Sequence, residues 1–392
     1  MKRSFAVPLV VALALMAYIP AAFAASTFYV NDNNCPGPGT GTKVDPFCTI
    51  SEAVTAAASG DTIIVRAGDY RETVSVTKSL TFRGAQAGVT AVKGRTKASK
   101  ESTVDNPSGT GGFDLKADNV TINGFTIEGQ FDTAPTSLAS GIRTSNVHSG
   151  YHIMNNIIRD NVAGLYLNTN TANPNSVTGN RFHANNEAGS GSGDAIESDQ
   201  GLHNVTISKN FFSGNASAAV VLSDSLPFTN DGIQFLKNRS DSPVLLYNTS
   251  ASSVFKNTFA RDVGSAVFLG GGDSNVTITK NAIHTPVFAG VRLADSPTIP
   301  NTSITISRNA ISGAGFYGIH IGTSSLSGGT IARNTVTGSD PEGILTETGN
   351  TGNTFSNNTV TKSKSFDIED DSTGNTYTNN TCGSSSPSGL CS

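Results

Sequence analysis

The chain has 392 residues and a formal net charge of −4, and only 14% of its residues are charged. This balance has neither the clustered basic residues of a nucleic-acid-binding protein nor the high net charge of a disordered chain. Glycine, asparagine, threonine and serine are abundant, but 36% of the residues are hydrophobic, which is enough to build a folded core.

The first 24 residues have the pattern of a secretory signal peptide. Lys2 and Arg3 precede an apolar run from Phe5 to Ile19, and Ala22-Phe23-Ala24 matches a small-x-small cleavage site. A membrane anchor is the alternative, but the run is short for a span of about 20 residues. We therefore expect an exported, soluble product that begins at Ala25 and has no membrane span.

The N-terminal part of the mature chain, residues 25–84, is predicted to form a cap and an opening coil. Ile50, Ala53, Val54 and Ala57 would share one face of a short helix that Gly60 stops, and this helix should cover the open end of a stack of strands. Residues 73–82 also alternate like strands, so the start of the first coil remains open.

The four cysteines flank two short loops. Cys35 and Cys48 flank the first, and Cys382 and Cys391 flank the second. Four cysteines allow three pairings. Two local disulfides are the simplest, since each would pin a turn-rich segment. Metal binding is the alternative, but no Cys-x-x-Cys spacing and no paired histidines accompany the cysteines.

A basic loop from Val92 to Glu101 interrupts the early strands. It contains Lys93, Arg95, Lys97 and Lys100. The preferred interpretation is a solvated insertion, and contact with an acidic glycan is the alternative.

Two short patterns alternate from about Asn119 to Cys382. One is apolar-x-apolar-x-x-Asn-x-apolar, as in Val205 to Phe212. The other is a small residue followed by apolar-x-apolar, as in Gly290 to Leu293. The asparagines of the first pattern are Asn156, Asn180, Asn210, Asn238, Asn257, Asn281, Asn309, Asn334, Asn358 and Asn380. The 224 residues from Asn156 to Asn380 contain nine steps, a mean of about 25 residues. This spacing and the period of two exclude helical solenoids and propellers.

These repeats predict an all-β parallel β-helix of three-stranded coils, about ten or more in number. Residues 25–392 would form one domain, with repeated coils over 119–382 and a tail over 383–392. Strands of successive coils would stack about 4.8 Å apart around an apolar core. The repeated asparagine would lie at a sharp bend, because asparagine tolerates left-handed backbone angles and its amide can bond to the asparagine of the next coil.

The chain resembles the pectate lyase-like superfamily of secreted right-handed β-helices over nearly all of the mature sequence. The resemblance rests on the asparagine repeats and on an N-terminal segment with Gly60-Asp61-Thr62-Ile63 and Gly68-Asp69-Tyr70-Arg71-Glu72. It implies a polysaccharide partner and assigns substrate to the outer face of the Gly-Ile-x-Ile strand. The catalytic signatures of pectate lyases, pectin hydrolases and pectin methylesterases are missing. Only Asp370-Asp371 matches an aspartate pair of the hydrolases, so the resemblance carries no catalytic residue.

The outward residues of that strand would form one column along the stack. In coil order they are Arg143, Tyr166, Glu197, Val221, Leu245, Phe268, Arg292, His320 and Leu345. Since tryptophan is absent, Tyr166 or Phe268 would have to supply the aromatic face on which a sugar ring stacks. The apolar middle of the column would need a loop or a partner to cover it.

A first polar patch combines Arg143, Tyr166 and Glu197 with Asp194 and Asp199. Neighbouring carboxylates could bind Ca²⁺, divide acid and base roles, or hydrolyse a glycosidic bond, and Arg143 could neutralise a uronate. The alternative is solvated surface, since Arg143 and Glu197 are two coils apart. The long loop from His183 to Gly193 could overhang this patch.

A second polar patch combines Arg292 and His320 with Asp295 in the following turn. An arginine beside acidic Ca²⁺ ligands is the base of pectate lyases, but the acidic set is thin here. A lone outward histidine is more often plain surface.

Three functions fit these observations. The preferred hypothesis is an exported protein that binds a polysaccharide or a protein partner through the outer face of the stack. A lyase or hydrolase of an acidic glycan is the first alternative, and a purely structural surface protein is the second. Carboxylates that point into one cleft, with pKa values shifted by proximity, would favour the enzyme. The oligomeric state and any metal dependence stay open.

Overall fold

A computed structural model describes residues 24–95, 97–106, 111–130, 139–222, 227–260, 264–296 and 298–392. The predicted signal peptide lies outside the described residues except for Ala24, the last residue of the proposed cleavage site. Within the described ranges, no helix is both long enough and apolar enough to cross a membrane.

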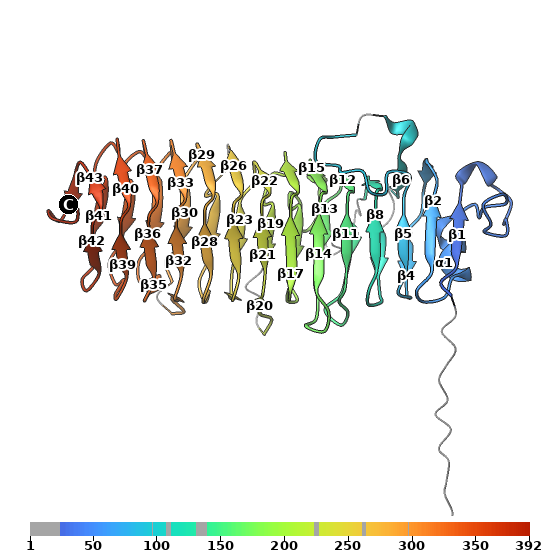
Figure 1. The fold of residues 1–392 in the computed structure, drawn as a ribbon, viewed down its shortest axis with the longest axis horizontal. Coiled ribbons are helices and arrows are strands. Elements are labelled where there is room, and N and C mark those ends of the chain that lie inside the picture. Colours follow the sequence, from blue (N-terminus) through green and yellow to red (C-terminus); the bar gives the residue numbers. More distant parts are fainter. Residues whose placement is uncertain are drawn as a thin grey trace, which may run out of the picture.

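The chain winds into a long stack of parallel strands, with the N-terminal segment at one end and the C-terminal segment at the other (Figure 1). In the described part of the chain, three sheets of 14, 13 and 13 strands run the length of the stack, and each strand pairs with the equivalent strand of the next coil. The predicted all-β parallel β-helix with three strands per coil is therefore confirmed.

The strands of each long sheet are given in the order in which they pair. The β1–β42 sheet contains β1 (Thr27–Val30), β2 (Thr62–Val65), β5 (Thr81–Arg83), β8 (Thr121–Asn123), β11 (His152–Met154), β14 (Asn175–Thr178), β17 (Val205–Ser208), β21 (Gln234–Leu236), β25 (Ser253–Phe255), β28 (Thr277–Thr279), β32 (Thr305–Ser307), β36 (Thr330–Ala332), β39 (Thr354–Ser356) and β42 (Thr376–Thr378). The β3–β43 sheet contains β3 (Gly68–Tyr70), β6 (Ser102–Asp105), β9 (Thr126–Glu128), β12 (Ile157–Arg159), β15 (Arg181–His183), β18 (Phe211–Ser213), β22 (Arg239–Ser240), β26 (Thr258–Ala260), β29 (Ala282–His284), β33 (Ala310–Ser312), β37 (Thr335–Thr337), β40 (Thr359–Thr361) and β43 (Thr381–Cys382). The β4–β44 sheet contains β4 (Val74–Val76), β7 (Gly111–Leu115), β10 (Ser140–Arg143), β13 (Ala163–Tyr166), β16 (Ile196–Ser198), β19 (Val220–Leu222), β23 (Val244–Leu246), β27 (Val267–Leu269), β30 (Ala289–Leu293), β34 (Tyr317–Ile321), β38 (Ile344–Thr346), β41 (Ile368–Asp370) and β44 (Ser385–Ser386).

Shorter elements lie outside the three long sheets. Two pairs of short strands are β20 (Asn230–Asp231) with β24 (Thr249–Ser250) and β31 (Asn301–Thr302) with β35 (Leu326–Ser327). The helical elements are α1 (Ile50–Ala56) and the 3₁₀ turns η1 (Asp32–Asn34) and η2 (Ala98–Lys100).

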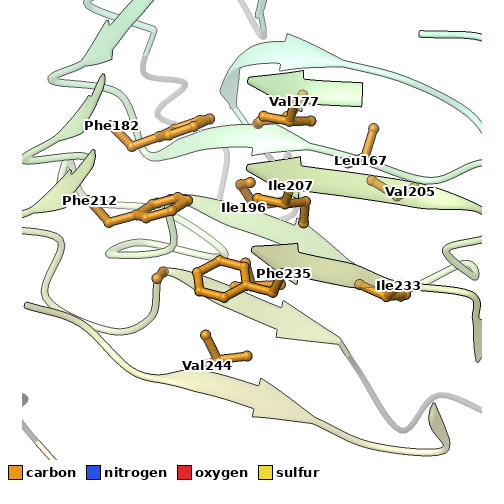
Figure 2. Packing of buried hydrophobic residues seen from close by; sticks show 14 of the residues in the cluster. Leu167, Val177, Phe182, Ile196, Val205, Ile207, Phe212, Ile233, Phe235 and Val244 are labelled. Carbon is orange, nitrogen blue, oxygen red and sulfur yellow. The ribbon is translucent and has the colours of Figure 1, made fainter. Parts of the chain in front are cut away.

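The core of the stack follows from the period-two alternation of the strands. Inward side chains of all three sheets are buried in one continuous hydrophobic cluster. Phe182 and Phe212 occupy equivalent positions of successive coils in the β3–β43 sheet, and their ring centroids are 5.1 Å apart. Phe235 on β21 extends this pile of rings from the β1–β42 sheet, with its ring centroid 5.7 Å from that of Phe212 (Figure 2). The same coil repeat therefore pairs the backbones of successive strands and packs their inward side chains against one another.

The predicted asparagine ladder is confirmed at the bends between the β1–β42 and β3–β43 sheets. The backbone N–H and the side-chain amide of Asn210 both donate to the side-chain oxygen of Asn238, at 2.9 and 3.2 Å. The amide of Asn210 also donates to the Val177 carbonyl of the preceding coil, at 2.8 Å. The ladder therefore satisfies polar groups at a bend that is buried in every coil.

The expected reason for asparagine at these bends was only half right. The left-handed backbone angles belong to the residue before each ladder asparagine, for example Lys209 and Lys237, with φ of 55° and 54°. The asparagine itself is selected by its hydrogen bonds. A second ladder that the sequence analysis missed joins Asn161, Asn185 and Asn215 at the bend between the β3–β43 and β4–β44 sheets.

The N-terminal end of the stack is covered by α1, as predicted. Thr49 and Glu52 form a capping box at its start, and Ile50, Ala53 and Val54 are buried against the stack. The helix ends at Ala56 rather than at Gly60, because Ala57 already takes an extended conformation. The strands of the stack begin well before Asn119, since β4 and β5 pair with β7 and β8.

Both local disulfides are present, Cys35–Cys48 beside η1 and Cys382–Cys391 beside the last coil. The second bond folds the C-terminal segment back, so that Leu390 packs against the core.

Residues 84–95 and 97–101, between β5 and β6, form a strap over several coils (Figure 1, cyan, beyond β12 and β15). Arg95 holds this strap down. Its guanidinium donates to the carbonyls of Phe125 and Asn155, at 3.0 and 2.6 Å, and pairs with Glu101 at 2.9 Å. The solvated insertion is thus correct for Lys93, Lys97 and Lys100, which are exposed, but wrong for Arg95, whose side chain is 7% exposed.

Candidate active site

The outer face of the β4–β44 sheet carries the predicted column in the predicted register. Arg143 pairs with Tyr166, Tyr166 with Glu197, and the series continues through each expected residue to Leu345. Asp114 precedes Arg143 and Glu369 follows Leu345 in the same register. We call this series, from Asp114 to Glu369, the outer column.

The first patch gathers around Glu197 on β16. Ile196 and Ser198 point inward and are buried, so Glu197 points outward and is half-buried. Asp194 lies just before the strand and Asp199 just after it, so three carboxyl groups are grouped on one coil.

Tyr166 connects this coil to the preceding one. Its hydroxyl donates to the carboxylate of Asp199 and accepts a hydrogen bond from the amide of Gln200, at 2.8 Å. Burial and the hydrogen bond to Asp199 raise the pKa of Tyr166 well above its usual value. The phenol therefore serves as a fixed donor that orients Asp199, and it is a poor base.

The environment favours the protonated forms of two of the three carboxyls. Burial, and then the negative charges of Asp194 and Asp199, raise the pKa of Glu197 to about 7. Burial raises the pKa of Asp194 to about 6, although hydrogen bonds from Ser217 and the Ala218 backbone act in the opposite direction. Of these two carboxyl groups, Glu197 thus retains its proton up to the higher pH, close to neutrality.

Several polar atoms of this patch are buried without a hydrogen-bond partner among the described residues. They are Nε of Arg143, Oδ1 of Asp194 and Oε2 of Glu197. Such atoms are unusual in a folded protein and mark a place where a ligand can supply the missing partner. Arg143 forms no salt bridge with Glu197, in line with their separation by two coils.

The second patch differs from the expectation for a lone surface histidine. His320 is 4% exposed, and its Nε2 lies 2.9 Å from a carboxylate oxygen of Glu347. The ring of Tyr317 stacks on the imidazole, with centroids 4.5 Å apart. Burial lowers the pKa of His320, while Glu347 acts in the opposite direction. Arg292 lies over the rings of Phe268 and Phe288, and Asp295 accepts a hydrogen bond from the Thr323 backbone.

Tyr317, Glu347 and Phe288 were missed from the sequence. Glu347 follows the outward position Leu345 by two residues, as Asp199 follows Glu197, so the same period-two rule could have found it. Tyr317 and Glu347 line an open groove of about 420 Å³ together with Glu342, Glu369 and Asp371.

The middle of the outer column is half-buried rather than freely exposed. Val221, Leu245 and Phe268 all fall in this class, and the Tyr247 ring lies 5.6 Å from that of Phe268. Residues 223–226 and 261–263, which follow β19 and precede β27 in the chain, lie outside the described residues.

The remaining candidates have structural partners. Asp370 is buried and accepts hydrogen bonds from Tyr377 and Ser372, at 2.9 Å each, so it braces the last coils. Within the described ranges, no group of three or more histidine, cysteine, aspartate or glutamate side chains is placed to hold a metal ion.

Comparison with known proteins agrees with the fold. The family model described as "Right handed beta helix region" matches residues 189–302 and 271–391, which together cover just over half of the chain. No curated protein matches the sequence significantly.

Among solved structures, the catalytic unit of the GH87 α-1,3-glucanase from Streptomyces thermodiastaticus is similar, with a TM-score of 0.68 and 16% identity over 95% of this chain and 71% of that one. The A-module of the mannuronan C-5 epimerase AlgE6 from Azotobacter vinelandii gives 0.64 and 12%, over 85% and 93%. A PL6 alginate lyase in complex with a trisaccharide gives 0.61 and 15%, over 94% and 87%.

These neighbours are β-helix carbohydrate-active enzymes, and at this level of identity the likeness is one of fold. The chain belongs to the right-handed β-helix family, because the family model matches more than half of it and because it has the asparagine ladder and three sheets of parallel strands.

Proposed function

We propose that this protein is an exported polysaccharide hydrolase that binds a glycan chain along the outer column and cleaves it at Glu197. The observation that carries the proposal is the grouping of three carboxyl groups, Asp194, Glu197 and Asp199, on one coil of the outer column, with Oε2 of Glu197 buried and without a partner among the described residues. In this setting burial and the two neighbouring carboxylates raise the pKa of Glu197 to about 7. Binding through the outer face, the function preferred from the sequence, is part of this proposal.

The three carboxyl groups divide into complementary roles. Hydrolysis of a glycosidic bond needs one carboxylic acid that protonates the leaving oxygen and one carboxylate that activates water or stabilises the developing positive charge. Glu197 suits the first role because it retains its proton near neutral pH. Asp194, whose pKa is about 6, and Asp199, oriented by Tyr166, suit the second.

Elimination by a lyase fits this site less well. A lyase needs a base that removes a carbon-bound proton, and Tyr166, the neighbour of Glu197 in the column, could act as one only in its ionised form. Its raised pKa keeps the phenol protonated at neutral pH. The similarity to solved carbohydrate-active enzymes supports a polysaccharide substrate, and the two disulfides support an extracytoplasmic location.

The test is an assay of the purified mature chain on neutral and acidic polysaccharides, following new reducing ends and unsaturated-product absorbance together. We expect reducing ends without absorbance. The variant Glu197→Gln should lose at least about 100-fold in rate, with an unchanged melting temperature near pH 6. The matched control is Glu187→Gln, which changes an exposed glutamate and should retain full activity.

Each outcome assigns a class. Equal rates in wild type and Glu197→Gln would remove Glu197 from the mechanism. Absorbance in place of reducing ends would make the protein a lyase. Neither signal, with retention of the protein on one glycan, would leave a binding protein and reject the hydrolase.

A further inference from the structure

A second cleft lies on a different face of the stack, between the strap and the outer side of the β3–β43 sheet. Its volume is about 520 Å³, within the range of small-ligand sites. Its floor consists of outward residues of successive strands, including Thr103, Thr126, Ile157 and Arg181, and its roof is formed by the strap around Gly94 and Arg95.

The cleft is preformed, because its roof is fixed to the stack at several points. Arg95 binds the carbonyls of Phe125 and Asn155, and the Ala91 N–H donates to the Gly179 carbonyl at 3.1 Å. The carboxylate of Glu101 accepts from both Arg95 and the Thr126 hydroxyl. A roof tied to three successive coils holds the cleft open without a ligand.

The charges that line the cleft leave one cation without a counter-ion. Arg95 pairs with Glu101 and Arg159 pairs with Glu128, at 2.9 and 2.5 Å. Among the described residues, Arg181 forms no salt bridge and its guanidinium has no hydrogen-bond acceptor. It lies 5.6 Å from the centre of the Phe211 ring. Asp69 also lines the cleft and also forms no salt bridge among the described residues. It lies four strands away from Arg181 in the same register.

Gly94 makes room for this arginine. A Cβ at Gly94 would lie 2.7 Å from an Nη atom of Arg181, so a larger residue would displace the guanidinium. His183 lines the same end of the cleft, and the strap carries the exposed Lys93 and Lys97. The tip of the strap is therefore the positive end of the cleft.

We propose that this cleft is a binding site for a carboxylate-bearing sugar, a uronate, held by Arg181 beneath the strap. A guanidinium binds a carboxylate through two parallel hydrogen bonds, and Arg181 has the free donors for this geometry. The site is separate from Glu197, which lies on the β4–β44 sheet, so it attaches the protein to an acidic polymer while the outer column remains free. It stands whether or not the hydrolase proposal holds.

The experiment measures binding of a galacturonate trimer, a sulfated trisaccharide and a neutral glucose trimer to the full mature chain by calorimetry. We expect the uronate to bind and the neutral sugar not to bind. Arg181→Gln should weaken uronate binding at least about tenfold, and binding should weaken with added salt. The matched control, Arg308→Gln, changes an exposed arginine elsewhere and should not alter affinity.

A second variant and a second site keep the outcome clear. Gly94→Ala should also weaken uronate binding, even if Arg181→Gln proves unstable. Glu197→Gln should leave uronate binding unchanged, so a failure of the hydrolase proposal would not mimic a failure of this one. Uronate binding that is as tight in Arg181→Gln as in wild type would overturn the proposal. Binding of the sulfated sugar alone would overturn the assignment to carboxylate.

Discussion

Glu197 and Asp194 are three residues apart, yet their environments separate their proton affinities. Hydrogen bonding from Ser217 and the Ala218 backbone acts to lower the pKa of Asp194, whereas the negative charges of Asp194 and Asp199 act to raise that of Glu197. Burial raises both pKa values, that of Asp194 to about 6 and that of Glu197 to about 7. The pair is therefore poised with opposite charge states in a narrow range near neutrality.

This difference predicts the pH dependence of hydrolysis. The rate should be highest between pH 6 and 7, because Asp194 is protonated below this range and Glu197 is ionised above it. On each side the rate should fall about tenfold per pH unit. The measurement is a profile of kcat/KM from pH 4 to 9. A rate that stays constant from pH 7 to 9 would contradict the role of Glu197 as proton donor.

The same residue links pH to stability. Its pKa in the folded chain is raised, so its contribution to stability is complete at low pH and is lost as pH rises through about 7.

For individual residues, the sequence predicted which way a side chain points better than it predicted which residues that side chain contacts. The period of two correctly placed Glu197 and Tyr166 on the outer column, because a strand turns alternate side chains outward. It could not predict that Tyr166 reaches Asp199 of the next coil, since that contact joins residues 33 positions apart. It also treated His320 as surface, because burial by Tyr317 and Phe288 depends on how neighbouring coils stack.

At the scale of elements, each bend depends on its ladder asparagine. The side-chain oxygen of Asn334 accepts two hydrogen bonds from Asn309, and its amide donates to Asn358 and to the Ile306 carbonyl, all at 2.9 to 3.0 Å. All four hydrogen bonds are buried, so removing the Asn334 side chain leaves donors and acceptors on both neighbouring coils without partners.

Asn334→Ala should therefore lower the free energy of unfolding by about 2 kcal/mol. Thr335→Ala, a change at the adjacent exposed position, is the matched control and should cost a few tenths of that amount. Urea denaturation followed by circular dichroism measures both. Equal losses in the two variants would mean that the ladder contributes no more than an ordinary strand residue.

The strap shows why one element escaped sequence reasoning. A run with Lys93, Arg95, Lys97 and Lys100 is typical of a solvated loop, and three of the four side chains are indeed exposed. The fourth is buried because its acceptors, Phe125 and Asn155, are brought beneath the loop by coils that follow it in the chain. No local pattern carries that information.

At the scale of the whole molecule, the two disulfides lie at opposite ends of the stack. Cys382–Cys391 closes a loop with a sequence separation of 9 and holds Leu390 against the core. Tyr377 of the last coils also packs against this core, and its ring stacks on that of Phe355. A coil in a solenoid contacts only its neighbours, so a change at one end should stay local.

The double variant Cys382→Ser with Cys391→Ser should lose about 2–3 kcal/mol of local stability. Hydrogen exchange followed by mass spectrometry should show faster exchange in residues 354–391, and no change before Asn309. Replacing Cys35 and Cys48 in the same way should affect only the N-terminal segment. Faster exchange along the entire chain would contradict this local picture.

The strap also limits how such a chain can evolve. Repeat proteins change length by duplicating or losing a coil, and most of this stack tolerates that in principle, since each ladder asparagine needs only an identical neighbour. The coils of Phe125, Asn155 and Gly179 are different, because Arg95 and Ala91 bind their carbonyls from one continuous segment. An extra coil there would move an acceptor by about 4.8 Å, beyond reach of its donor. Length variation among descendants of this sequence should therefore concentrate in the coils that follow β15.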